Sequence, residues 1–301
     1  MLQEPAFVEA EFDQLKRSNL AQLDQMRSDP QALAMMGLQK HLAPFGPDDP
    51  RAVRTPDEQI ADLQKVTLAD VKNFYTDFYG ASRSELTVIG DFDSEQMQVM
   101  ARDLFSQWKS PKPFSRLLQP MAAVESINRS METPDKANAT FAAGQLLNVG
   151  DEHPDYPALV MGNYLLGGGF LNSRIAARIR QKDGLSYGAG SMFNARAKDE
   201  TGIFMAYAIA APQNVAKVEA AFKEELARAI KDGFTEQEIA EGKKGWLQGR
   251  DVSRANDSEL LMLLAGNAFS IAASTTTPIW RKSRGANGRS DCNRDAAAPC
   301  T

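Results

Sequence analysis

An arginine and a tyrosine, Arg180 and Tyr187, are the side chains of this sequence whose types and spacing could do chemistry. Arg180 lies in an arginine-rich amphipathic segment, and Tyr187 follows the helix-stopping pair Asp183-Gly184. A helix-to-strand corner here brings Arg180 and Tyr187 together at one edge of a sheet. A guanidinium and a phenol can both donate hydrogen bonds to a carbonyl oxygen that gains negative charge. The alternative is a solvated helix arginine beside an ordinary sheet aromatic residue.

The glycine triplet Gly167-Gly168-Gly169 interrupts an apolar helix just before this corner. Such a triplet can be the C-cap and turn of that helix. It does not follow a strand with the Gly-x-Gly-x-x-Gly spacing of dinucleotide sites. The triplet therefore gives little support for phosphate or dinucleotide binding.

The sequence carries only two histidines, His41 and His153. A catalytic zinc site on a helix-borne His-x-x-Glu-His draws two imidazoles and a general base from that motif. Neither histidine stands in such a motif, so both are predicted as surface or capping residues and no metal ligand is assigned. The cysteines, Cys292 and Cys300, lie in the last ten residues, so nucleophilic catalysis lacks both a base and a plausible thiol.

Composition narrows the class of protein. A length of 301 residues suggests two domains or parts of two. The net charge is −5, and no cluster of lysines and arginines lies next to a group of aromatic residues. Both features argue against nucleic-acid binding. No apolar run approaches the roughly 20 residues of a membrane span, and the first residues do not read as a signal peptide. Localisation stays open, because an exported longer precursor fits the sequence equally well.

The elements before the corner are mostly helical. Periodicity predicts helices over residues 6–28, 31–41, 66–80 and 94–108, another helix that starts at residues 55–58, and a strand over residues 85–91. Thr55 and Thr67 are predicted N-caps. Apolar side chains at helical spacing are expected in the core: Val71, Phe74, Tyr75, Phe78, Met97, Met100, Ala101, Leu104 and Phe105.

The proline-rich segment 109–120 reads as a linker. Beyond it, strands are predicted over 126–132 and 138–147, a helix over 153–166, and a hairpin of strands over 186–195 and 202–211. An amphipathic helix over 212–232 should bury a face that includes Phe222 and Ile230. Thr235 begins another helix that is expected to reach about residue 268. The last stretch, 270–301, has no period and is either a disordered tail or a sequence out of register with the normal protein.

Several of these stretches resemble one family, the pitrilysin/insulinase-type zinc metallopeptidases, which include the mitochondrial processing peptidases. Residues 5–23 and 66–93 resemble its first repeat unit, and residues 156–191 are the most specific match. The resemblance covers roughly residues 5–268. It implies an α+β fold of tandem units, each a mostly antiparallel sheet with helices packed on one face.

The resemblance also divides the chain. It implies the later part of a first, incomplete unit over 1–117, a linker and first strand region over 118–134, and a second unit over 135–269. The chain then reads as a fragment of a longer protein. In the family, a glycine-rich segment followed by an arginine and a tyrosine marks the half without the metal.

By this resemblance, Arg180 and Tyr187 are catalytic residues that hold substrate and stabilise the oxyanion, and Gly167, Gly168 and Gly169 contact substrate. Zinc belongs to the family, but its ligands are not on this chain. The implied function is the metal-free half of a zinc-dependent endopeptidase, inactive alone, whose partners are a peptide substrate and a zinc-bearing half or subunit. The alternative is a non-catalytic structural or assembly relative with the same fold.

Overall fold

The computed structural model describes residues 2–272, and the first third of that range is helical. Its five helices are α1 (Glu9–Met26), α2 (Pro30–Leu42), α3 (Pro56–Lys65), α4 (Leu68–Phe78) and α5 (Ser94–Phe105). The Thr55 side chain accepts from the backbone N–H of Glu58 and the Thr67 side chain from that of Asp70, and both helices have complete capping boxes. The predictions of Thr55 and Thr67 as N-caps are confirmed.

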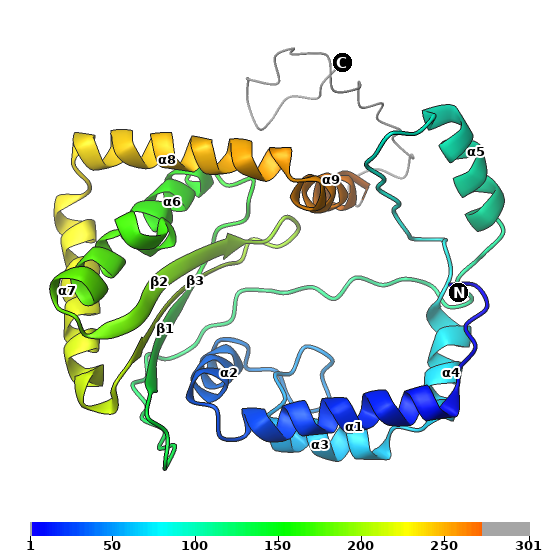
Figure 1. Cartoon of the computed structure of the whole chain (residues 1–301), viewed down its shortest axis with the longest axis horizontal. Helices are drawn as coiled ribbons and strands as arrows, with labels where there is room; N and C mark the ends of the chain where they lie inside the picture. The colour runs from blue at the N-terminus through cyan, green and yellow to red at the C-terminus, as the bar shows by residue number, and fades with distance from the viewer. Residues whose placement is uncertain (1, 273–301) are drawn as a thin grey trace.

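A three-stranded antiparallel sheet forms the centre of the second part. Its strands are β1 (Ala139–Leu147), β2 (Ser186–Ala195) and β3 (Gly202–Ala210), in the order β1-β3-β2. The β2–β3 hairpin and the strand over 138–147 are confirmed. Figure 1 shows α6 (Tyr156–Asn163) and α7 (Val215–Asp232) on one side of this sheet, with α2 beside β1. The architecture is therefore α+β, as the resemblance implies.

The main core lies between β3, α7 and the π-helical segment η3 (Ala176–Lys182). Alanines at alternate positions of β3 let these helices approach the sheet closely. Burial of the side chains that meet there supplies the main driving force for folding of this part. The core residues are Leu166, Ile175, Ile179, Ala206, Ala208, Ala210, Val218, Ala221 and Phe222.

Two predicted strands are wrong. Residues 85–91 and 126–132 are not paired with any strand of the described chain. A strand is stable only when a neighbouring strand satisfies its backbone N–H and C=O groups. Residues 85–91 carry the right side-chain pattern, but residues 2–272 supply no neighbouring strand for it.

The predicted burial of the α4 and α5 apolar faces is wrong in part. Phe74 on α4 is 57% exposed, and Met100 and Leu104 on α5 are similarly open, whereas Tyr75, Met97, Ala101 and Phe105 are half-buried. An amphipathic helix buries its whole apolar face only against a second layer, and within residues 2–272 these two faces are covered only in part. Phe74 packs instead against Phe78, with ring centroids 4.9 Å apart.

Two further corrections concern the C-terminal helices. The long helix ends at Ala255 rather than continuing, so that α8 (Glu236–Ala255) is followed by a separate α9 (Asp257–Ala272). The Asn256 side chain accepts from the backbone N–H of Glu259 and starts the second helix. Ile230 is 78% exposed rather than part of the α7 core face. Most of the predicted irregular tail, residues 273–301, lies outside the described residues.

The linker is anchored to the turn between β2 and β3. Arg116 binds both carboxylate oxygens of Asp199, at 2.8 and 3.0 Å, and the Gln119 carbonyl accepts from the Thr201 hydroxyl at 3.0 Å. This hydrogen bonding by Arg116 holds the pKa of the Asp199 carboxyl below its usual range. The anchor fixes a segment that has no helix or strand of its own between α5 and β1. The domain boundaries implied by the resemblance stay predictions.

We expect Arg116→Ala to release this linker. A hydrogen bond between charged groups contributes about 1.5–3 kcal/mol, so local opening of residues 109–124 should become roughly tenfold more frequent. Limited digestion with chymotrypsin, followed by mass spectrometry, measures the cleavage rate in this segment. Arg129→Ala, an exposed arginine farther along the same segment, is the matched control. Equal cleavage of the two variants would show that the Arg116–Asp199 pair does not restrain the linker.

Candidate functional site

The predicted corner between helix and strand is present. Arg180 lies on η3 and Tyr187 near the start of β2. The backbone N–H of Leu185 donates to the Ile179 carbonyl at 2.9 Å, and Gly184 adopts a φ of +61°. Only three residues, 183–185, therefore separate η3 from β2, which brings the two candidate residues onto one end of the sheet. The left-handed conformation explains why the helix stops at a glycine.

Tyr187 sits on a β-bulge. Ser186 pairs with Ala210 and Gly188 with Ile209, so Tyr187 has no partner on β3. The Ser186 hydroxyl stabilises the bulge, because it lies 2.7 Å from the carbonyls of both Gly188 and Ile209 and accepts from the backbone N–H of Gly188. Bulges re-aim side chains and are common beside active sites. The Tyr187 side chain is 71% exposed and its hydroxyl bonds to no described residue.

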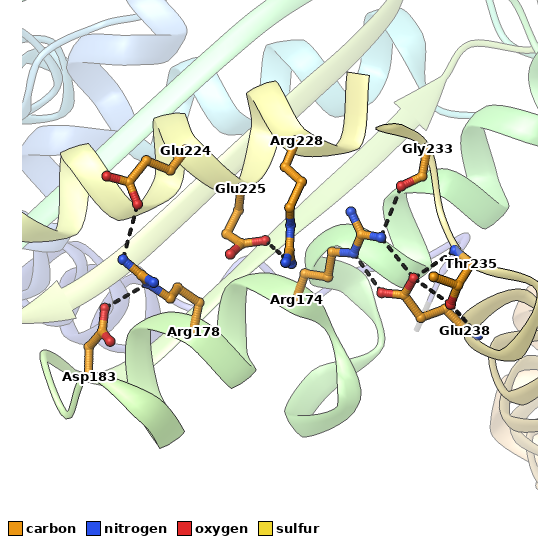
Figure 2. Close-up of polar contacts among 9 residues, drawn as sticks. All are labelled: Arg174, Arg178, Asp183, Glu224, Glu225, Arg228, Gly233, Thr235 and Glu238. Carbon is orange, nitrogen blue, oxygen red and sulfur yellow. Dashed lines mark hydrogen bonds and ion pairs between the residues drawn. The ribbon is translucent and has the colours of Figure 1, made fainter. Parts of the chain in front are cut away.

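The arginines of the amphipathic segment divide into two kinds. Figure 2 shows Arg174 against Glu238 and Arg178 between Asp183 and Glu224. Arg180, in contrast, is exposed, and no ion pair or hydrogen bond ties it to any residue within 2–272. The structure therefore separates two arginines that pair with carboxylates from one that makes no such contact within residues 2–272.

The pair of Arg174 and Glu238 is the strongest electrostatic contact near the corner. Arg174 Nε and Nη2 donate to the two Glu238 carboxylate oxygens at 2.6 and 2.8 Å, and Nη2 also donates to the Gly233 carbonyl. The guanidinium stacks over the Phe234 ring at 4.4 Å. These hydrogen bonds from Arg174 lower the pKa of Glu238 to about 2. The pair ties the residues just before η3 to the start of α8.

The glycine triplet lies where the helix meets the sheet. A side chain on Gly167 would place its Cβ 2.4 Å from the Ser191 hydroxyl oxygen, and one on Gly169 would place it 2.7 Å from the Tyr164 carbonyl oxygen. Gly167 is buried and Gly168 is exposed. Close approach of backbones explains the need for glycine at two of the three positions. Contact of Gly167, Gly168 or Gly169 with a substrate stays a prediction.

The two histidines have structural contacts. His41 Nε2 lies 2.8 Å from the Glu125 carbonyl, and His153 Nδ1 accepts from the backbone N–H of Asp155. Across residues 2–272, no three histidine, cysteine, aspartate or glutamate side chains gather as a metal site. In the same part of the chain, no helix is long and apolar enough to cross a membrane.

Sequence reasoning missed the bulge and the Arg174–Glu238 pair. Glu238 takes part in the start of its own helix, because its carboxylate accepts from the backbone N–H of Thr235. Its contact with Arg174 joins residues 64 positions apart in the sequence. No local sequence pattern predicts such a contact. The Ser-x-Gly spacing around Tyr187 is the one local sign of the bulge.

Residues 65–245 match the sequence model of a family described as the peptidase M16 inactive domain. This match covers more than half of the chain. The chain belongs to the peptidase M16 inactive-domain family. The resemblance to the zinc peptidases, on the side of the half without the metal, is thereby confirmed.

Relatives of this M16 domain carry contrasting names. It is 25% identical over 235 residues to YmfF of Bacillus subtilis, named a probable inactive metalloprotease, covering 77% of this chain and 48% of that protein. It is 27% identical over 210 residues to an uncharacterized zinc protease of Streptomyces coelicolor, covering 68% and 45%. The chain thus spans about half the length of the curated relatives it matches.

A solved structure shares the fold of this domain. The crystal structure of a peptidase M16 inactive domain from Pseudomonas fluorescens superposes with a TM-score of 0.75 at 22% identity. The match covers 89% of this chain and 62% of that one. The likeness shows that the α+β architecture is that of M16 domains.

Proposed function

We propose that this M16 domain is a half that is inactive alone and holds an extended polypeptide beside a separate zinc-bearing half. The observation that supports this proposal is that Arg180 and Tyr187 are both exposed donors without partners in residues 2–272, on the two elements that a tight corner joins. A guanidinium and a phenol that face solvent without partners can bind a peptide carbonyl at little cost in broken contacts.

The chemistry of cleavage then belongs to the other half. With two separated histidines, the sequence lacks the His-x-x-Glu-His set that supplies zinc ligands and a general base. The family description and the name of the Bacillus relative support a chain without activity of its own. The name of the Streptomyces relative supports zinc in other members of the family. In a complete assembly, Arg180 and Tyr187 donate to the carbonyl oxygen as it becomes an oxyanion.

A second candidate is a purely structural or assembly role for the same fold. The word "inactive" in the family description favours it as much as it favours a peptide-holding half. The two candidates differ at Arg180 and Tyr187. A structural role gives these side chains no ligand, whereas a peptide-holding role makes polypeptide binding depend on both.

Polypeptide binding by the chain alone distinguishes the candidates. Fluorescein-labelled β-casein, an unfolded polypeptide, is titrated with the chain while fluorescence anisotropy is followed. Arg180→Ala should weaken binding about tenfold or more, because a hydrogen bond from a charged group contributes about 1.5 kcal/mol or more. Tyr187→Phe should weaken binding about fivefold, because a neutral hydrogen bond contributes about 1 kcal/mol. Lys182→Ala removes a neighbouring exposed charge from η3 and should bind as the unaltered chain does.

Catalysis is tested by adding the polypeptide encoded immediately upstream, together with Zn²⁺. Hydrolysis should occur only in the mixture and fall roughly 10²–10³-fold in Arg180→Ala, the usual effect of removing an oxyanion donor. If neither variant changes casein binding or hydrolysis, the structural role is correct and the peptide-holding proposal is wrong.

A further inference from the structure

The bulge in β2 changes which of its residues lies opposite the end of β3. Farther along the strand, Ala189 pairs with Ala208. A regular antiparallel register would therefore place Tyr187, two residues earlier, opposite Ala210. The extra residue of the bulge instead places Ser186 opposite Ala210 and leaves Tyr187 without a partner on β3.

The position opposite Ala210 belongs to the core. Residues directly opposite each other on neighbouring strands lie on the same face of a sheet. Ala208 and Ala210 are both core residues, exposed by 2% or less. Ser186, which takes this position, is only 9% exposed, whereas Tyr187 is 71% exposed. The bulge thus puts a small hydroxyl side chain in a buried place that regular pairing would give to a tyrosine.

The Ser186 hydroxyl bridges both strands across the extra residue. It lies 2.7 Å from the carbonyl oxygens of Gly188 on β2 and Ile209 on β3, and it accepts from the backbone N–H of Gly188 at 3.1 Å. Backbone groups that lose their regular partners at the bulge are therefore satisfied by a side chain. Without this hydroxyl, regular pairing with Tyr187 opposite Ala210 becomes the alternative way to satisfy them.

We propose that Ser186 is the positioning residue for Tyr187. Its hydroxyl stabilises the bulged register, in which the phenol faces solvent, over the regular register, in which the tyrosine turns toward the core. The inference rests on the proposed function for its purpose, because that function makes the Tyr187 phenol a donor to bound polypeptide. Ser186 acts through Tyr187 and makes no contact with the polypeptide.

Nitration of the full chain by tetranitromethane tests this position directly, without any polypeptide present. Mass spectrometry of digested samples gives the rate at each tyrosine. In the unaltered chain, Tyr187 should be nitrated at least as fast as Tyr79, which is 48% exposed. In Ser186→Ala, the rate at Tyr187 relative to Tyr79 should fall at least about twofold, which requires half of the molecules to adopt the inward register. A loss of stability alone would speed nitration instead.

Ser191→Ala is the matched control. It removes another buried hydroxyl from β2, one that donates to the Asn163 side chain rather than to the bulge. Nitration of Tyr187 should be unchanged in this variant. Circular dichroism checks that both alanine variants fold, and the comparison of Tyr187 with Tyr79 in the unaltered chain needs no variant.

Binding of labelled β-casein gives the functional consequence. Ser186→Ala should weaken binding about twofold to fivefold, because only the outward form presents the phenol. In the Tyr187→Phe background, Ser186→Ala should cause no further loss, since the two changes act through the same hydroxyl.

The two readouts separate the inference from the proposed function. Slower nitration of Tyr187 in the unaltered chain than of Tyr79 would overturn the inference, and so would an unchanged or faster rate at Tyr187 in Ser186→Ala. A further loss of binding when Ser186→Ala is added to Tyr187→Phe would also overturn it. If nitration falls as expected while neither variant changes casein binding, Ser186 positions Tyr187 as inferred and the proposed function is wrong.

Discussion

Arg174→Ala should lower the free energy of unfolding by about 3 kcal/mol. The substitution leaves the Glu238 carboxylate without its bidentate partner and removes the bond to the Gly233 carbonyl. Breaking a buried ion pair typically costs 3–5 kcal/mol, and the lower end applies here because Glu238 remains partly exposed. Urea unfolding followed by circular dichroism measures the change.

The dependence of unfolding free energy on pH tests the role of the Arg174–Glu238 pair in a second way. The pKa of Glu238 is about 2 in the folded chain against an ordinary value of 4.5. Since the folded pKa is depressed, the stabilisation is complete above pH 4.5 and is lost as the pH falls toward 2. Arg174→Ala should show a weaker loss of stability across this window. Glu238→Gln should do the same, because it removes the titrating group.

Arg180→Ala is the matched control for Arg174→Ala. Both remove a guanidinium from the same helical segment, but Arg180 is exposed and unpaired within the described chain. Its unfolding free energy should change by no more than about 0.5 kcal/mol. If the two variants are equally stable, the division into structural and available arginines is wrong.

Gly167→Val should also destabilise the chain by about 3 kcal/mol. Its Cβ would lie 2.4 Å from the Ser191 hydroxyl oxygen and 2.6 Å from the Ser191 backbone nitrogen. The backbone of β2 cannot move away without disturbing the sheet, and overpacking of this kind costs about 1–3 kcal/mol or more. The change would also disturb the hydrogen bond from Ser191 to Asn163. Thermal unfolding by calorimetry measures the loss.

Gly249→Ala provides a control of opposite sign. Gly249 lies inside α8, and a Cβ there meets nothing within 4 Å. Replacing a glycine in a helix interior by alanine stabilises by roughly 0.5–1 kcal/mol. A Gly167→Val variant as stable as the unaltered chain would show that η1, the π-helical segment Tyr164–Gly168, is not packed tightly on β2.

Local signals carried the correct part of the sequence prediction. The caps at Thr55 and Thr67 and the β2–β3 hairpin each depend on residues close in sequence. They can therefore be predicted without knowledge of the tertiary structure. The strand predicted over 85–91 failed because pairing is a property of two segments, and the second one is absent from residues 2–272. The exposed parts of the α4 and α5 faces have the same cause, because burial of a helix face also needs a second segment that packs against it.

The residue types of the candidate site could be chosen from the sequence, but their contacts could not. The spacing of Arg180 and Tyr187 indicated the corner, and Gly184 indicated where η3 ends. Nothing in the sequence separated Arg180 from Arg174, because the difference lies in Glu238, which is distant in sequence.

The bulge at Tyr187 has a consequence for how this surface can change over evolutionary time. In a regular strand, each side chain is fixed to the core or to solvent by alternation, and a substitution disturbs its neighbours. Tyr187 stands outside that alternation, and Arg180 beside it is equally uncommitted. Both positions can therefore change over evolution while thermal stability stays nearly constant. At Arg174, by contrast, a substitution removes the hydrogen-bonding partner of the Glu238 carboxylate and so lowers stability.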